Sequence, residues 1–525
     1  MMRILRWLPG LVAGASLAGA QESLQFTVQS RSAGPHGAAV ALREVTWNAQ
    51  QSALILCDFW DSHSSPGAAR RVGELAPRVA EAVATARSRG VLIIHAPSDC
   101  MAYYEGHAAR LRARETPAAD NLPDGIDQWQ YWLNAEEEAA GYPIDASPDG
   151  CDDTDSEKSA WQAVLAREGR LNQRWPWRSQ HPLVGIDPEH DVISDRGREI
   201  WNVLRSRNIR HVFMAGVHLN RCVCGRPFGI RQLRRHGIET VLLRDLTDAL
   251  FDPRKPPQFP QVAGITRMVA HVERYLCGTT ESAAVFGGRS ALLREDRRVS
   301  LAVLTGESEY HTAESLTGFL EDDAAADFRV TWLTEDSGGS TGRLLHAHAL
   351  DSADLILVSM RRKALAAPDL TSLRRAVARG VPVAAIRTGS HAFALRSGTP
   401  VPADKAVWPE WDAHVLGGNY QNHHGADARV TVDLLPVAHP ILRGVHGPFA
   451  SGGSLYRNSP LQPGAIPLLS GKAEGIAQPE PVAWVHATPA GARSFTTSLG
   501  HPEDFAVPAF RKLLHHGLRW AARMD

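Results

Sequence analysis

Short apolar segments alternate with longer helical patterns in two separate parts of this chain. The first part predicts strands at 53–59, 91–95, 210–215 and 239–243, with helices at 69–88, 198–207 and ending near 236. The second predicts strands at 299–304, 329–333, 354–359 and 382–386, with helices at 313–320 and 370–379. Strands that alternate with helices imply parallel sheets covered by helices. The sequence therefore predicts an α/β fold with two three-layer α/β/α domains and mainly parallel sheets.

The length of the chain also predicts more than one domain, because 525 residues exceed what one hydrophobic core usually serves. The charged stretch LREDRR at 293–298 separates the two patterns and is predicted to be the linker, which gives domains at 21–293 and 298–525. Residues from about 97 to 182 interrupt the first pattern with five tryptophans, many prolines and the acidic run CDDTDSE. This insertion is either a lid that shapes a pocket, or a packing or dimer contact.

The first 20 residues have the pattern of a secretory signal peptide. Arg3 and Arg6 precede an apolar run at 7–17 and the small residues AGA at 18–20. Cleavage is predicted after Ala20, so the mature protein is expected to be exported, either to a periplasm or beyond the cell. A retained anchor is the alternative, but the run is shorter than the roughly 20 apolar residues needed to cross a bilayer. No membrane span is expected after cleavage.

The charge of the chain gives no sign of a nucleic-acid partner. Its net charge is −1 and it has no long basic run. The expected partner is a small-molecule substrate, and a homo-oligomer is possible. Six cysteines in a chain of this length are too few for a disulfide scaffold. Cys100 and Cys151, which flank the same insertion, either pair with each other or remain free thiols.

The stretch RHVFMAGVHLNRCVCGRPFGIRQL at 210–233 predicts a reactive thiol. An apolar strand runs into Gly216 and Val217 and brings Cys222 to the start of a predicted helix. The free N–H groups and partial positive charge of a helix N-terminus lower the pKa of a cysteine. The strand at 53–58 ends on Asp58, the first candidate for the proton acceptor, and strand ends of one open sheet converge on the same crevice.

These two motifs, ALILCDFWDSH at 53–63 and VFMAGVHLNRCV at 212–223, resemble the isochorismatase-like cysteine hydrolase family. The family pattern is an Asp that closes the first strand, a Lys before a mid-domain helix, and a Cys after a Gly-Val turn that contains an unusual cis peptide. Asp58 and Cys222 match this pattern. Where the Lys is expected, HDVISDRGREIWNVL contains none, so Arg196 is predicted to supply the positive charge, with Lys158 as a weaker substitute.

The resemblance implies attack by Cys222 on a carbonyl or amidine-like carbon, with Asp58 moving the proton and water hydrolysing a covalent intermediate. The backbone N–H groups of Arg221 and Cys222, with the turn before them, are the predicted oxyanion hole. Some relatives with this fold hydrolyse a vinyl ether without a cysteine. Because the cysteine is present here, hydrolysis of an amide or related C–N bond is favoured.

Four side chains beside these residues are predicted to bind substrate: Asp61, His63, His218 and Asn220. The D-x-x-D-x-H spacing of 58–63 is too weak a signal to infer a metal site. No metal and no cofactor are therefore predicted.

The segments AVLTGESEYHTAESL, VAAIRTGSHAF, LGGNYQNHHG and TTSLGHPEDF in the second domain resemble the ThuA-like family, named for trehalose utilisation. Its fold is close to that of class I glutamine amidotransferases, which carry a cysteine at the elbow after the fourth strand. Here the elbow reads RTGSH at 387–391, which excludes glutaminase chemistry by a thiol. Arg387 and His391 are predicted to bind a ligand. Catalysis by Ser390 and His391 is disfavoured, because adjacent side chains rarely point the same way.

The sequence therefore predicts an exported cysteine hydrolase that acts on a C–N bond of a small molecule and carries a ThuA-like ligand-binding domain. One alternative is an exported small-molecule or carbohydrate-binding protein without catalysis, which the missing lysine supports. The other places catalysis in the ThuA-like domain.

Overall fold

The computed structural model describes residues 22–336, 342–425 and 429–525. The predicted signal peptide at 1–20 lies outside these residues. None of the helices in the described ranges combines the length and the apolar character needed to cross a membrane.

The first domain contains an eight-stranded sheet in the order β2-β1-β8-β7-β6-β3-β4-β5. All neighbours from β8 to β5 pair in parallel, whereas β1 is antiparallel to both β2 and β8. The strands are β1 (Ser23–Gly34), β2 (Gly37–Asn48), β3 (Ser52–Cys57), β4 (Leu92–Ala96), β5 (Val192–Ile193), β6 (His211–Val217), β7 (Glu239–Asp248) and β8 (Gly278–Thr280). The helices are α1 (Pro66–Ser88), α2 (Ala108–Glu115), α3 (Ala135–Ala140), α4 (Asp155–Arg167), α5 (Gly197–Ser206), α6 (Ile230–Arg235), α7 (Gln261–Tyr275) and α8 (Ser282–Phe286).

The second domain contains a nine-stranded sheet in the order β10-β9-β11-β13-β21-β20-β19-β16-β17. Its first five strands are parallel, and the rest extend the sheet with antiparallel pairs. The strands are β9 (Val299–Gly306), β10 (Phe328–Leu333), β11 (Leu355–Met360), β13 (Val383–Ile386), β16 (Val430–Leu434), β17 (Phe449–Ser451), β19 (Ile466–Ala473), β20 (Glu480–Ala487) and β21 (Arg493–Thr497). The helices are α9 (Thr312–Asp322), α10 (Ala367–Ala378) and α11 (Pro508–Ala521), and β12 (Leu365–Ala366), β14 (Lys405–Ala406), β15 (Asn422–His424) and β18 (Leu455–Arg457) form two small sheets.

The predicted α/β fold class is confirmed, and each predicted strand and helix is present with its ends shifted by a few residues. The antiparallel half of the second sheet was not predicted. One core of buried apolar residues runs from Leu24 to Leu293, and the other two lie mainly within residues 301–521.

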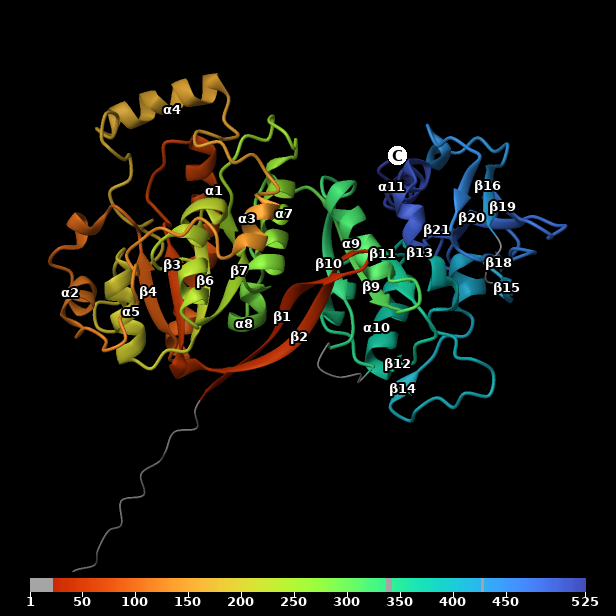
Figure 1. The fold of residues 1–525 in the computed structure, drawn as a ribbon, viewed down its shortest axis with the longest axis horizontal. Helices are drawn as coiled ribbons and strands as arrows, with labels where there is room; N and C mark the ends of the chain where they lie inside the picture. Colours follow the sequence, from red (N-terminus) through yellow and green to blue (C-terminus); the bar gives the residue numbers. More distant parts are fainter. Residues whose placement is uncertain (1–21, 337–341, 426–428) are drawn as a thin grey trace, which may run out of the picture.

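The hairpin formed by β1 and β2 joins the two domains and was not predicted. Gln29 of β1 pairs with Thr279 of β8 in the first sheet. Val40 and Leu42 of β2 belong instead to the core of the second domain, where β2 packs against α9. Figure 1 shows this long hairpin leaving the first domain and reaching the second. A segment from the start of the chain therefore completes the core of the C-terminal domain.

Candidate functional site

The candidate site lies at the carboxyl ends of β3 and β6, which are neighbouring parallel strands. All six residues of β3 are buried, as expected for an apolar strand in the middle of a parallel sheet. Cys57, the last residue of β3, pairs with Gly216 of β6. A side chain at Gly216 would lie 2.0 Å from the Cys57 carbonyl oxygen, and its φ of 142° also favours glycine. This close approach brings Asp58 next to the turn that follows β6.

Cys222 follows that turn, but it does not begin a regular helix as predicted. It lies in a single π-helical turn, Leu219–Val223, and the next helix, α6, starts only at Ile230. The peptide bond between Val217 and His218 is cis, as the resemblance implied. Cys222 is 8% exposed and Asp58 is fully buried.

The charges around the thiol oppose the prediction of a low pKa. Burial and the negative charge of Asp58 raise the pKa of Cys222, and only Arg226 lowers it. Burial likewise raises the pKa of Asp58, while Arg226 and a 2.7 Å hydrogen bond from the Ser98 N–H oppose that rise. The predicted low-pKa thiol is therefore wrong. The thiol therefore lies beside the Asp58 carboxyl group, with Arg226 as the nearby cation.

The cation beside Asp58 is Arg226 and not Arg196, which was predicted for this role. The Nε atom of Arg226 lies 3.6 Å from Asp58 Oδ2, and its Nη2 lies 3.3 Å from Asp99 Oδ2. Its guanidinium also lies over the ring of Trp129, 5.4 Å from the centroid. The only signal for Arg226 in the sequence was its place four residues after Cys222.

The side chain of Arg196 forms no ion pair with Asp58 in the described part of the chain. It is 67% exposed, and its Nη1 atom lies 3.9 Å from Glu199 within helix α5. Lys158, the weaker substitute, lies on α4 and interacts with Cys151. The structure therefore does not bring either predicted cation to Asp58.

Two of the predicted substrate-binding residues are held by contacts within the protein. Asp61 accepts hydrogen bonds from Arg170 Nη2 at 2.8 Å and from the Arg178 N–H at 2.9 Å. The Asn220 side chain donates to the Leu250 carbonyl and accepts from the Leu250 N–H, at 2.8 and 3.0 Å. Both side chains therefore position loops beside the site.

The other two, His63 and His218, face each other edge to face with their ring centroids 5.0 Å apart. Burial lowers the pKa of His63 to about 4 and that of His218 well below its usual range, and Arg71 adds to both shifts. Both imidazoles are therefore neutral near pH 7. His218 Nε2 is buried without a hydrogen-bond partner among the described residues.

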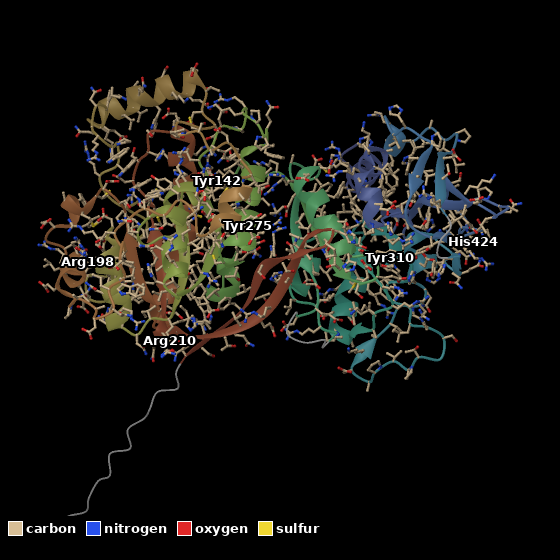
Figure 2. The ribbon with its side chains drawn as sticks, in the orientation of Figure 1. Tyr142, Arg198, Arg210, Tyr275, Tyr310 and His424 are labelled. Atoms are coloured by element: carbon tan, nitrogen blue, oxygen red, sulfur yellow. The ribbon has the colours of Figure 1, made fainter. Side chains whose placement is uncertain are left out.

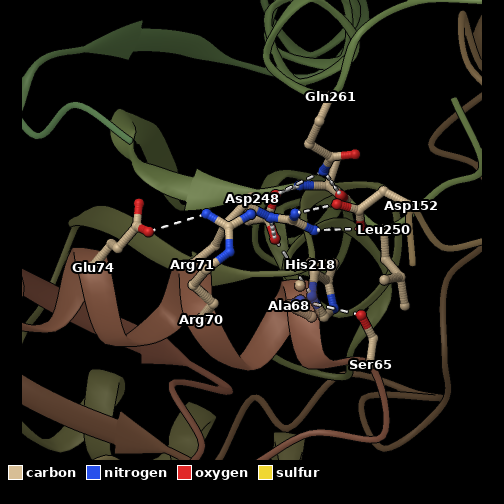
Figure 3. Close-up of polar contacts among 12 residues, drawn as sticks. Ser65, Ala68, Arg70, Arg71, Glu74, Asp152, His218, Asp248, Leu250 and Gln261 are labelled. Atoms are coloured by element: carbon tan, nitrogen blue, oxygen red, sulfur yellow. Dashed lines mark hydrogen bonds and ion pairs between the residues drawn. The ribbon is translucent and has the colours of Figure 1, made fainter. Parts of the chain in front are cut away.

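A buried ion-pair network supports the turn that contains His218 (Figure 3). Arg71 of α1 donates from Nε to Asp248 at 2.8 Å and from Nη1 to Asp152 at 2.6 Å. Asp248 is the last residue of β7 and pairs with Val217 in the sheet, and its Oδ2 atom lies 3.7 Å from His218 Nε2. Helix α1 is itself started by Ser65, whose hydroxyl accepts from the Ala68 N–H at 3.1 Å.

The insertion at about 97–182 contributes directly to this site. Trp177 stacks on Trp60 with centroids 4.1 Å apart, and the Trp161 indole donates to the His63 carbonyl at 2.8 Å. Asp99, Trp129 and Asp152 come from the same insertion. These contacts favour the lid over a segment that serves only for packing. Cys100 and Cys151 are free thiols and do not pair.

In the second domain, Arg387 is buried at the elbow after β13 and does not reach solvent. Its Nη1 atom donates to the carbonyls of Ser454 and Ser498 at 3.0 and 2.8 Å. The guanidinium lies between the rings of Tyr310 and Tyr456, 4.3 and 4.4 Å from their centroids. Arg387 therefore positions these tyrosines.

His391 does interact with the adjacent Ser390, contrary to the argument from side-chain direction. Ser390 Oγ lies 3.1 Å from His391 Nδ1. Burial, followed by nearby arginines, lowers the pKa of His391 to about 3, however. A histidine with so low a pKa is a poor base for activating a hydroxyl. Among the described residues, no group of three His, Cys, Asp or Glu side chains is arranged to hold a metal ion.

A family model matches most of the second domain. Residues 301–521 match the family model for ThuA, trehalose utilisation. This match confirms the resemblance carried by the motifs of the ThuA-like domain. No curated protein matches the chain.

Three solved structures similar to parts of the chain come from bacteria. A cysteine hydrolase from Pseudomonas syringae pv. phaseolicola 1448A is 15% identical, with 46% of this chain and 92% of that one covered and a TM-score of 0.28. An isochorismatase family protein from Burkholderia thailandensis is 15% identical, with 45% and 94% covered and a TM-score of 0.24. A putative ThuA-like protein from Parabacteroides merdae ATCC 43184 is 16% identical, with 44% and 91% covered and a TM-score of 0.32.

Proposed function

We propose that the first domain is a cysteine hydrolase that cleaves an amide or related C–N bond of a small molecule. The observation that carries this proposal is the convergence of Cys222, Asp58 and Arg226 in one buried site. Arg226 supplies the positive charge that a lysine would supply in the resembled family. The absence of a lysine was the main support for a binding protein without catalysis. With Arg226 beside Asp58, that absence no longer favours this alternative.

In the proposed reaction, the Asp58 carboxylate takes the thiol proton as Cys222 Sγ forms a bond to the carbonyl carbon. The C–N bond then breaks, the amine leaves with the proton from Asp58, and a thioester remains. Water attacks the thioester and gives a proton to Asp58, the C–S bond breaks, and that proton returns to the sulfur. Arg226 remains charged throughout and keeps Asp58 ionised between steps.

The geometry refines the proposed oxyanion hole. The Arg221 N–H, one of its two expected donors, instead donates to the His218 carbonyl at 2.9 Å. We therefore assign the hole to the Cys222 N–H. The neutral His218, with its unpartnered Nε2, is proposed to hold a polar group of the substrate.

Export and ligand binding complete the proposal. The N-terminal pattern of Arg3, Arg6, an apolar run and AGA supports an exported protein. The ThuA-like domain is proposed to bind a ligand, because its His391 lines a polar pocket.

Acylation by an activated ester tests the proposed chemistry without knowledge of the substrate. We expect p-nitrophenyl acetate to acylate Cys222 in the mature protein, as seen by intact-protein and peptide mass spectrometry, and the adduct to decay as water hydrolyses it. Cys222→Ala should form no adduct at that position, and Asp58→Asn should slow its formation and its decay. Arg196→Met is the matched control and should behave as wild type. Absence of a Cys222 adduct in the wild type would favour the binding-protein alternative.

A further inference from the structure

A polar pocket of about 360 Å³ opens in the ThuA-like domain, separate from the hydrolase site. Its size is in the range of sites for small molecules. Arg361, Arg362 and Arg396 line it together with His391. Tyr310, which Figure 2 labels in this domain, lies on its wall with Tyr420 and Tyr456.

The charge of the lining is unbalanced in favour of cations. Arg361 forms an ion pair with Glu309. Arg362 donates to the Ala394 carbonyl at 3.4 Å and hydrogen-bonds the Tyr420 side chain, and Arg396 forms no ion pair within the described part of the chain. Glu309 also lines the pocket, so three arginines face one carboxylate there. Positive charge near His391 is also the main influence, after burial, that lowers the pKa of that histidine. An anionic group would therefore relieve repulsion in this pocket, and the planar guanidinium group suits carboxylates and phosphates.

The remainder of the pocket is suited to a ring that carries hydroxyl groups. Tyr420 stacks on His391 with centroids 4.1 Å apart, which gives one flat wall. Gln421, Asn422 and Ser397 supply neutral hydrogen-bond donors and acceptors around it. Such a lining favours a polyhydroxylated molecule over an aliphatic acid.

We propose that this pocket binds an anionic carbohydrate, a sugar that carries a carboxylate or a phosphate. The acidic group pairs with Arg396 and Arg362, and the ring lies against the His391–Tyr420 stack. This proposal deepens the ligand-binding role proposed above for the ThuA-like domain and is independent of the hydrolase chemistry.

Isothermal titration calorimetry of the mature protein tests it with four probes: glucuronate, glucose 6-phosphate, glucose and inorganic phosphate. We expect one or both sugar anions to bind, glucose to bind at least tenfold more weakly, and the affinity to fall as salt is raised. Arg396→Gln, at an exposed position, and Arg362→Gln should each weaken sugar-anion binding about tenfold. Arg443→Gln, an exposed arginine outside the pocket, should leave the affinity unchanged.

Other outcomes would overturn the proposal in distinguishable ways. Glucose that binds as tightly as the sugar anions would overturn the anion assignment and leave the ligand-binding role intact. Inorganic phosphate that binds as tightly as glucose 6-phosphate would overturn the carbohydrate assignment. If none of the four probes binds, both the anion assignment and the carbohydrate assignment are overturned. Acylation of Cys222, measured on the same samples, reports on the hydrolase site separately.

Discussion

Replacing Arg226 tests whether this residue, and not Arg196, controls the ionisation of the proposed catalytic pair, Cys222 and Asp58. Arg226→Met keeps an unbranched apolar stem and removes the charge. Asp58 would then be buried beside Cys222 without the cation at its Oδ2 atom. Because burial already raises the pKa of Asp58, the loss of Arg226 should raise it further and so favour the protonated carboxyl group.

The distance in the structure sets the size of this effect. Two unit charges 3.6 Å apart, as between Arg226 Nε and Asp58 Oδ2, attract by about 4 to 5 kcal/mol at an effective dielectric constant of about 20. Loss of one partner of a buried pair costs about 3 to 5 kcal/mol in measured cases. An effect of about 3 kcal/mol corresponds to about a 100-fold smaller ratio of ionised to protonated carboxyl at a fixed pH.

The assay is the rate of iodoacetamide labelling of Cys222 as a function of pH, followed by peptide mass spectrometry. Arg226 lowers the pKa of Cys222, and labelling requires that the thiol give up its proton, so Arg226→Met should label up to about 100-fold more slowly at pH 7 and its pH profile should move to higher pH. Arg226→Lys keeps the charge and should recover most of the rate. Arg196→Met is the control and should match the wild type. Equal rates for Arg226→Met and wild type, with a slow Arg196→Met, would refute the assignment.

Two further predictions concern the ThuA-like domain. Leu42→Ala in strand β2 should lower the free energy of unfolding of this domain by about 2 to 5 kcal/mol, because Leu42 is fully buried in its core. Urea unfolding combined with hydrogen exchange of α9 measures this loss. An effect confined to the first domain would contradict the prediction. Burial raises the pKa of Asp412 to about 7, so the folded state holds that proton more tightly than the unfolded chain, and stability is lost as the pH rises from about 4 to 7. From pH 5 to pH 8, the free energy of unfolding of the wild type should therefore fall by about 3 kcal/mol relative to that of Asp412→Asn. Urea unfolding at each pH measures both free energies, and an equal change with pH in the two proteins would rule this out.

Most strands and helices could be predicted because a run of apolar residues indicates a segment that is buried in the core. The hairpin of β1 and β2 also had a signal, since Leu24, Phe26 and Val28 alternate with polar residues as a half-buried strand requires. What the sequence could not reveal was the position of β2. Val40 and Leu42 are buried against a domain that begins about 250 residues later, and no local pattern records such a partner.

The pKa of Cys222 shows why local reasoning failed at the site. A helix N-terminus stabilises a negative charge by about 0.3 to 1 kcal/mol, which is less than one pKa unit. Full burial can shift a pKa by about 3 to 5 units in the opposite direction, and an adjacent carboxylate adds to that shift. Burial of Cys222 and its contact with Asp58 both arise from the packing of β3 against β6, so they appear only once the sheet has formed.

The choice of Arg226 over a lysine is connected to the long insertion. A guanidinium in this position must be desolvated beside Asp58 and still satisfy its other nitrogens and its flat faces. Asp99 binds its Nη2 atom and Trp129 covers its face, and both residues belong to the insertion at about 97–182. Gly225 allows this contact, because a side chain there would lie 2.6 Å from the Trp129 ring. The departure from the lysine of the resembled family and the presence of the insertion are therefore two parts of one arrangement, in which the insertion holds the cation beside Asp58.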